Sequence, residues 1–246
     1  MRCSDVTARW ACFALWGPRA RDILSPLTDD ALSFGYMRMR ELAVGDVPVR
    51  ALRVTFVGEL GWELYCPTEY GAGLWRTLWQ AGREHGLVAG GYRAIDSLRL
   101  EKGYRVWAAD VTPDETPYEA GLGFCVRKQG GFIGAPALGL GAGSGAGASE
   151  SPAGAAQLDK RLRCIVLEDP RSVALGNEPV RIDGDVVGRV TSGGYGYTVE
   201  RSIAYAYVPA DVELGTTVEV DVFGEWVRGL LTREPLFDPK GERVRQ

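Results

Sequence analysis

Residues 91–124 read GYRAIDSLRLEKGYRVWAADVTPDETPYEAGLGF, and they combine one predicted helix with a long acidic loop. Gly91 and Gly103 bracket about three turns of helix, and a glycine just after the last helical residue is a common C-terminal stop. The helical spacing predicts that three apolar residues face the core: Ala94, Ile95 and Leu98. Beyond Gly103 an aromatic-rich stretch leads into a proline-punctuated acidic loop that ends at a glycine-rich turn.

The charges of this helix allow two interpretations. Asp96, Arg99 and Lys102 are three residues apart and share a stripe, whereas Glu101 lies on roughly the opposite side from Arg99. One interpretation is a solvated charged face. The other is a polar site with aromatic walls, which the nearby side chains of Trp107, Asp110 and Glu119 favour.

The first half of the chain mixes strands and helices without a regular βαβ rhythm. A buried strand is predicted at 10–16, a hairpin over 36–57 with its turn at Gly45-Asp46, and a further strand ending at Tyr65. Short and long helices are predicted after Gly17, with Pro18 at the first helical position, and over 69–85. The long helix should turn four side chains inward: Leu74, Trp75, Leu78 and Ala81. This pattern predicts an α+β fold with an antiparallel sheet.

The second half is predicted to be all-β. Residues 134–156 shift abruptly to Gly, Ala, Ser and Pro, which predicts a flexible linker. From 160 onward, short alternating runs recur about every ten residues, as in a small barrel or sandwich. We therefore predict an α+β domain over 1–133, a linker over 134–159 and a C-terminal β-domain over 160–246.

Composition excludes several classes of function. A net charge of −4 without a long basic run argues against nucleic acid, and no apolar stretch approaches the length of a membrane span. The start lacks the apolar segment of a signal peptide, so we expect a cytoplasmic protein. Five scattered cysteines and a single histidine, His85, predict no metal site and no Ser-His-Asp triad.

The run from 91 to 124 resembles the signature of the aminomethyltransferase (glycine-cleavage T-protein) family. Further segments resemble the family's folate-contacting turn (57–63), its strand and helix start (14–20) and its C-terminal barrel (186–207). The stretches 101–107 and 117–121 are most similar to the folate domains of sarcosine and dimethylglycine dehydrogenases. The resemblance implies a T-protein-like folate domain, incomplete at its N-terminus, followed by a small β-barrel.

The resemblance also implies a set of residues that bind tetrahydrofolate. The family's glutamate at the Glu63 position hydrogen-bonds the pterin, and a carboxylate can accept two parallel N–H bonds from the 2-amino-pyrimidinone edge. A purely structural role, with Glu63 ending a strand at the surface, is the alternative. The expected binding residues are Phe56, Trp62, Glu63, Arg93, Arg99, Tyr118 and Glu119. For Arg99, a supporting role beside Asp96 or Glu119 is an equal alternative.

Two departures from the family qualify this expectation. Phe56 stands where the T-protein branch has an aromatic hydroxyl, and Ile95 stands where it has an arginine that Arg93 could replace. We also expect the chain to lack the family's N-terminal portion with its catalytic aspartate, so no catalytic residue is assigned, and to hold no flavin site. Loss of that portion should uncover apolar surface around Phe13, Leu15 and Trp16.

These observations support two functions of different class. The first is tetrahydrofolate-dependent one-carbon transfer, with a small methylated amine as donor and with self-association or a partner subunit completing the site. Whether the chain is an enzyme by itself is left open. The second is a non-catalytic folate-fold module for binding or subunit interaction.

Overall fold

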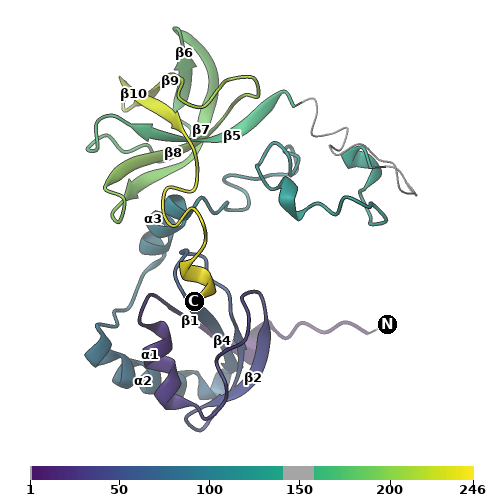
Figure 1. Cartoon of the computed structure of the whole chain (residues 1–246), viewed down its shortest axis with the longest axis vertical. Coiled ribbons are helices and arrows are strands. Elements are labelled where there is room, and N and C mark those ends of the chain that lie inside the picture. The colour runs from purple at the N-terminus through teal and green to yellow at the C-terminus, as the bar shows by residue number, and fades with distance from the viewer. Residues whose placement is uncertain (1, 141–157) are drawn as a thin grey trace. The chain divides into compact units, whose positions relative to one another are not determined.

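The computed structural model describes residues 2–140 and 158–246 (Figure 1). The chain divides into two compact units, which are described separately below. The first comprises Met1–Ile95 with Phe237–Gln246, and the second comprises Asp96–Leu236. The domain boundaries expected from the sequence stay a prediction, and residues 141–157 of the predicted linker lie outside the described residues.

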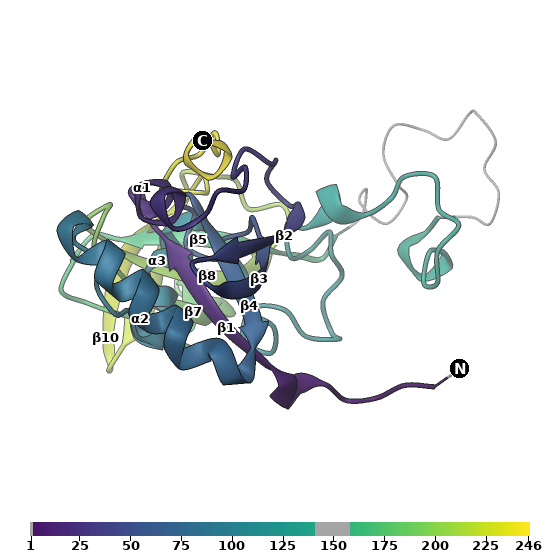
Figure 2. The same ribbon diagram turned by 90° about the horizontal axis from the view of Figure 1, so that it is seen from below.

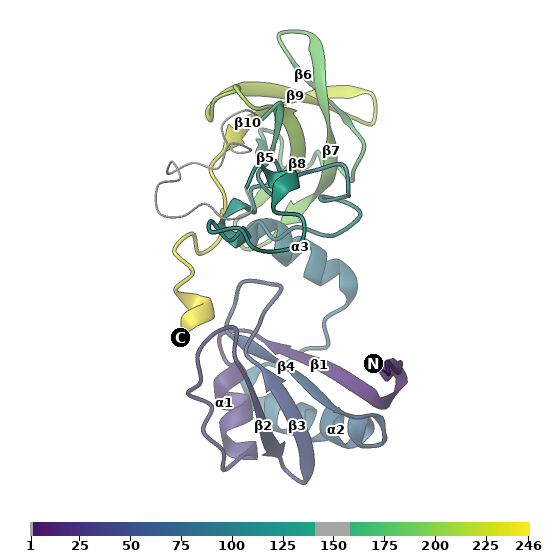
Figure 3. The same cartoon turned by 90° about the vertical axis from the view of Figure 1, so that its right-hand side faces the viewer.

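The first unit is built on a four-stranded antiparallel sheet with the order β1-β4-β3-β2. Its strands are β1 (Trp10–Trp16), β2 (Met39–Val44), β3 (Val47–Leu52) and β4 (Gly61–Pro67). Two helices, α1 (Ala20–Leu24) and α2 (Gly71–Gly82), contact each other and β4, so they cover the same face of the sheet (Figures 2 and 3). The α+β fold predicted from the sequence is confirmed.

Strict alternation on β4 fixes which side chains enter the core of this unit. Trp62, Leu64 and Cys66 are fully buried beneath the helices, whereas Glu63 and Tyr65 point to the other side. Gly61 allows the close approach of β1, because a Cβ there would overlap the carbonyl oxygen of Leu15 and lie 2.8 Å from the Trp16 Cα. The sheet face away from α1 and α2 is called the open face below.

Three local expectations for this unit are wrong. Helix α1 begins at Ala20, so Pro18 precedes the helix instead of occupying its first position. Trp75 is 44% exposed because it lies at the border of the apolar face of α2, and Leu74 and Leu78 occupy the positions of α2 that face the sheet. Leu15 is buried, since α1 and α2 cover its face of β1, whereas Phe13 and Trp16 are half-buried.

The second unit contains a closed six-stranded antiparallel barrel in the order β10-β5-β8-β7-β6-β9. Its strands are β5 (Lys160–Leu167), β6 (Pro179–Ile182), β7 (Asp185–Gly196), β8 (Arg201–Pro209), β9 (Thr217–Val222) and β10 (Glu225–Thr232). Inward-facing Val, Ile, Leu and Ala side chains fill the barrel, as expected for a small barrel that encloses packed side chains. The predicted C-terminal barrel is confirmed.

Helix α3 (Tyr92–Lys102) ends at Gly103, whose φ of 71° is the left-handed conformation expected of a glycine stop. Its expected apolar face is wrong in part. Ala94 is exposed, and Ile95 and Leu98 are only half-buried. The buried residues are instead the last turn, Arg99, Leu100, Glu101 and Lys102, where the charged side chains have protein partners.

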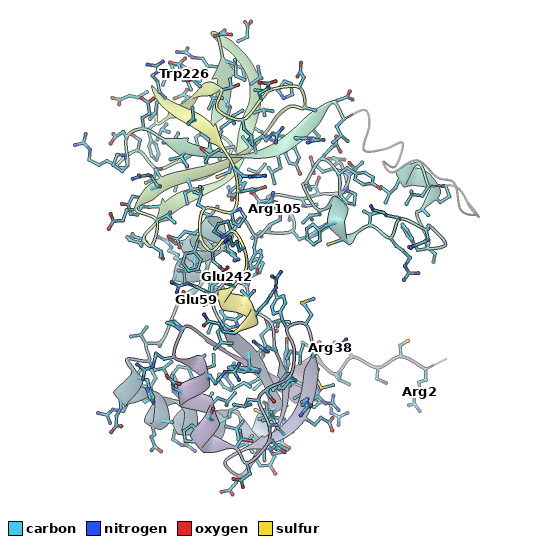
Figure 4. The ribbon with its side chains drawn as sticks, in the orientation of Figure 1. Arg2, Arg38, Glu59, Arg105, Trp226 and Glu242 are labelled. Carbon is cyan, nitrogen blue, oxygen red and sulfur yellow. The ribbon has the colours of Figure 1, made fainter. Side chains whose placement is uncertain are left out.

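Short 3-10 helices complete the described chain: η1 (Thr7–Arg9), η2 (Ser25–Leu27), η3 (Thr68–Tyr70), η4 (Arg83–His85), η5 (Gly123–Cys125), η6 (Pro136–Leu138) and η7 (Arg243–Arg245). Helix η7 belongs to the first unit, where Arg243 pairs with Glu59 at 3.0 Å. Figure 4 labels Glu59 and Glu242, which precedes Arg243 in the chain. Among the described residues, none of the helices combines the length and the apolar character needed to cross a bilayer.

Candidate functional site

The open face of the first unit carries a hydrogen-bonded pair, Glu63 and Tyr65. Both are half-buried, and the Tyr65 hydroxyl donates to Glu63 Oε2 at 2.8 Å. The other carboxylate oxygen, Oε1, accepts no hydrogen bond within the described part of the chain. Glu63 is therefore oriented on one side and has free acceptor capacity on the other.

The register of the sheet shows what surrounds this pair. Ala14 lies opposite Glu63 on β1, and Cys12 lies opposite Tyr65. The hydrogen bond to Glu63, together with burial, raises the pKa of the Tyr65 hydroxyl, and burial raises the pKa of the Cys12 thiol. Both groups are therefore protonated at neutral pH, so Glu63 faces a hydrogen-bond donor and an uncharged thiol.

The other residues expected around Glu63 lie at different depths. Phe56 lies in the turn before β4, is half-buried and makes a contact within the described part of the chain. Trp62 is fully buried in the core, so its present position supports the strand that carries Glu63. Arg93 is exposed on the first turn of α3. These residues belong to the first unit.

The remaining expected residues belong to the second unit, and here the charges of α3 form a buried network. Arg99 Nη1 donates to Asp110 Oδ2 at 2.7 Å, and both side chains are almost completely buried. Asp110 also accepts bonds from the Val106 N–H at 3.0 Å, from the Thr191 hydroxyl at 2.6 Å and from the Ser192 hydroxyl. The network thus joins the signature loop to β7.

Glu101 makes a second contact of the same kind. Its Oε1 accepts from the N–H groups of Thr198 at 2.6 Å and Val199 at 3.1 Å, in the turn between β7 and β8. Gly196 leaves room for this carboxylate, because a Cβ there would lie 2.9 Å from it. Of the two interpretations of the helix charges, the solvated face is therefore wrong for Arg99 and Glu101, which fasten α3 to the barrel.

Glu119 is held by a local turn. The loop contains two Thr-Pro-x-Glu units in succession, 112–115 and 116–119. In each unit the glutamate accepts from both the N–H and the hydroxyl of its threonine, at 2.6–2.9 Å, as in a capping box. Burial alone would raise the pKa of Glu115, but bonds from Thr112 and the ion pair with Lys160 hold it below its ordinary value.

A cavity of about 440 Å³ opens beside this loop, with mainly apolar walls and an exposed tryptophan. It is lined by Arg105, Trp107, Val111, Thr112, Pro113, Glu115, Pro117 and Leu122. Arg105, which Figure 4 labels, is fixed by an ion pair with Glu234. Next to Pro117 in the chain, the hydroxyl of Tyr118 is buried and has no hydrogen-bond partner among the described residues.

The structure therefore divides the expected residues between two units. Glu63, Phe56, Trp62 and Arg93 belong to the first, and Arg99, Tyr118 and Glu119 belong to the second. Their joint binding of tetrahydrofolate, which the resemblance implies, stays a prediction. Sequence reasoning missed Tyr65, although its position two residues after Glu63 on an alternating strand was a usable signal. It also missed Thr191 and Ser192, which no local pattern connects to Asp110.

Comparisons with known proteins identify the family of the chain. The model of the GCVT N-terminal domain matches residues 1–130, and that of the glycine cleavage T-protein C-terminal barrel domain matches residues 160–238. The chain belongs to the glycine cleavage T-protein family. This confirms the resemblance seen in the signature.

Individual relatives include oxidoreductases and aminomethyltransferases. The chain is 39% identical over 248 residues to 4-methylaminobutanoate oxidase (formaldehyde-forming) of Paenarthrobacter nicotinovorans, and 36% identical over 250 residues to human mitochondrial dimethylglycine dehydrogenase. Each alignment covers 98% of this chain but 28% of the relative. An aminomethyltransferase of Symbiobacterium thermophilum is 35% identical, over 95% of this chain and 60% of its own length.

A solved structure of the family shares the fold. The glycine cleavage system aminomethyltransferase T from Bartonella henselae matches with a TM-score of 0.75 at 23% identity, over 94% of this chain and 60% of that chain. The chain therefore spans about a quarter of the length of the two oxidoreductases and about three-fifths of the two aminomethyltransferases.

Proposed function

We propose that this chain is the tetrahydrofolate-binding part of a T-protein-like transferase or demethylating enzyme and takes part in one-carbon transfer. The observation that carries the proposal is Glu63. It lies in the stretch 57–63 that resembles the family's folate-contacting turn, on an open sheet face, with one carboxylate oxygen fixed by Tyr65 and the other free. A carboxylate so placed fits the two parallel N–H groups of a pterin.

The other residues of the first unit have supporting roles in this proposal. Phe56 would pack its ring against the pterin, and Tyr65 holds the rotamer of Glu63 before ligand arrives. Trp62, fully buried, keeps β4 in place. Arg93 is an exposed guanidinium that could pair with a carboxylate of the folate tail, where Ile95 cannot. Binding of this kind works by preorganising the pocket and lowers the cost of orienting the reactants.

Tetrahydrofolate would supply two amine nitrogens that condense with a one-carbon unit at the oxidation level of formaldehyde. The residues of this chain would bind and orient it, and none is assigned to proton transfer. The donor is proposed to be a small methylated amine, because the relatives include enzymes named for dimethylglycine, sarcosine and 4-methylaminobutanoate. Self-association or a partner subunit is proposed to complete the site.

A second function has its own support. Arg99, Glu101 and Glu119, three charged residues of the family-like signature, are engaged in contacts within the second unit. If these residues serve only to hold the fold together, the chain would be a non-catalytic domain for binding or subunit interaction. It differs from the leading proposal in one measurable respect, which is the affinity for tetrahydrofolate.

Titration calorimetry with tetrahydrofolate distinguishes the two proposed functions. Glu63→Ala should weaken binding by about 2–3 kcal/mol, the scale for loss of a charge-assisted hydrogen-bonded partner, which is about 30- to 150-fold in affinity. The matched control is Glu41→Ala, which removes an exposed carboxylate from the same open face and should leave affinity unchanged. Equal affinities of parent and Glu63→Ala would contradict the pterin contact, and absence of binding by the folded parent would favour the second function.

A further inference from the structure

The register of β1 and β4 places a second tryptophan beside Glu63. Gly61 and Glu63 share the open face of β4, and on β1 Trp16 lies opposite the first of them and Ala14 opposite the second. Trp16 is therefore a diagonal neighbour of Glu63, and such neighbours are about 7–8 Å apart, within reach of aromatic and long side chains. Trp62, which the sequence suggested, follows Gly61 in the chain but is fully buried on the opposite face.

Two contacts fix the indole of Trp16. Its Nε1–H donates to the carbonyl oxygen of Val54 at 3.0 Å. Its Cδ1 lies against the bare backbone of Gly61, since a Cβ added there would be 2.5 Å from this atom. The indole thus occupies space that a larger residue two positions before Glu63 would need. Because the N–H already has an acceptor, the rest of the ring is apolar surface with no polar atom to satisfy.

The other end of β1 provides an internal comparison. Trp10 also points to the open face, but the guanidinium of Arg50 lies over its ring at 4.5 Å from the centroid. Within the described part of the chain, no aromatic ring and no cation packs on the half-buried indole of Trp16. Of the two tryptophans on this face, the one beside Glu63 is therefore the one suited to take a planar ligand.

We propose that Trp16 is a binding residue of the folate site, and that the pyrimidinone ring of the pterin packs against its indole while Glu63 holds the 2-amino edge of that ring. This inference rests on the proposed function and adds the residue that favours a flat ring. The pyrimidinone ring stays planar in the reduced cofactor, so it can stack on an indole. Ala14, exposed and carrying only a methyl group, leaves the space between the two contacts open.

Calorimetry with two ligands tests this contact. One ligand is tetrahydrofolate, and the other is 6-methyltetrahydropterin, which keeps the pterin and lacks the aminobenzoyl-glutamate tail. Trp16→Leu should weaken the binding of both by about tenfold, the scale for loss of a stacked aromatic partner. The matched control is Trp10→Leu, which removes an indole from the same strand and the same face and should leave both affinities unchanged.

Trp16→Phe separates stacking from support of the turn before β4. Phenylalanine keeps an aromatic ring but loses the N–H that bonds to Val54. If Trp16 stacks on the pterin, Trp16→Phe should retain most of the affinity that Trp16→Leu loses. Equal losses in the two variants would mean that Trp16 acts only through Val54, and would overturn the inference.

Ala14→Leu tests the same site without removing the indole. The position is exposed, so the fold can accept a larger side chain there, whereas the leucine would occupy the space that the pterin ring needs. Both ligands should bind about tenfold or more weakly. Ala43→Leu, at an exposed position on the same face of β2, is the control and should leave both affinities unchanged. Unchanged affinity in Ala14→Leu would contradict the proposed position of the ring.

The two ligands also separate this inference from the folate proposal. A folded parent that binds neither ligand would overturn both. A parent that binds both, with Trp16→Leu unchanged, would overturn the Trp16 contact and leave the role of Glu63 standing. A loss in Trp16→Leu that is confined to tetrahydrofolate would place the contact on the tail and would also overturn the inference. Circular dichroism and the stoichiometry of binding correct each affinity for any unfolded fraction.

Discussion

Replacement of Asp110 by alanine tests whether the signature loop is a structural clamp. The carboxylate accepts four hydrogen bonds, from Arg99, Val106, Thr191 and Ser192, and only 1% of the residue is exposed. Asp110→Ala removes every one of these contacts and leaves the guanidinium of Arg99, itself 4% exposed, without its buried counter-charge. Removal of one partner from a buried ion pair costs about 3–5 kcal/mol. That is a large fraction of the roughly 5–15 kcal/mol that stabilises a typical domain.

A matched control comes from the same arginine. Asp96 lies 3.6 Å from Arg99 Nε, but its side chain is 62% exposed. Solvent screens such a pair, so Asp96→Ala should cost less than about 0.5 kcal/mol. The double variant Arg99→Met/Asp110→Leu removes both buried charges together, and we expect it to be more stable than Asp110→Ala.

Urea unfolding measures these differences as shifts of the midpoint at constant slope. Hydrogen exchange shows which part of the chain is destabilised, because loss of the clamp should speed amide exchange in β7 and leave exchange in β3 and β4 unchanged. A cost below about 1 kcal/mol for Asp110→Ala, or one equal to that of Asp96→Ala, would refute the argument that this network holds the loop to the barrel.

Three further predictions concern other parts of the chain. Burial raises the pKa of the Cys164 thiol from 9.0 to about 12, so the unfolded chain loses this proton at a lower pH than the folded chain. The free energy of unfolding should therefore fall above pH 9 by up to about 1.4 kcal/mol per pH unit. Cys164→Ala should make the urea midpoint less dependent on pH between pH 9 and 12. Gly61→Ala should destabilise the first unit by about 1–3 kcal/mol in urea, because its methyl group overlaps the Leu15 carbonyl; a neutral result would show that β1 can shift. Tyr65→Phe should weaken tetrahydrofolate binding by about 0.5–1.5 kcal/mol in calorimetry, less than Glu63→Ala, and a larger loss would contradict a positioning role.

Local patterns predicted most of the fold. Strand β1, the turn at Gly45-Asp46 and the end of α3 at Gly103 all depend on neighbouring residues, and the structure has each of them where the sequence indicated. The barrel strands follow from alternation and turn residues in the same way. Such features depend on backbone conformation and on which side chains face water, both of which short windows of sequence record.

The errors concern contacts made over long distances in the sequence. Arg99 and Glu101 were open to interpretation as surface charges because two of the partners that bury them against the barrel, Ser192 and Thr198, lie more than ninety residues away. Burial of a charge depends on whether such partners exist, and helical periodicity contains no information about them. Glu119 shows the opposite case, since its partner Thr116 is three residues away and the capping-box pattern could have been recognised in the loop.

The contacts of the charged residues separate those that can serve folding from those that can serve binding. A carboxylate with all its acceptor positions used inside a unit has no capacity left for a ligand, which is the situation of Asp110. Glu63 retains a free oxygen on an accessible face. If the folate proposal holds, Glu63→Ala should lower the affinity for tetrahydrofolate without lowering the urea midpoint. Asp110→Ala should lower the urea midpoint without lowering the affinity of the protein that remains folded. If both variants lowered affinity and stability together, one network would serve both folding and folate binding. The division of roles derived from these contacts would then be wrong.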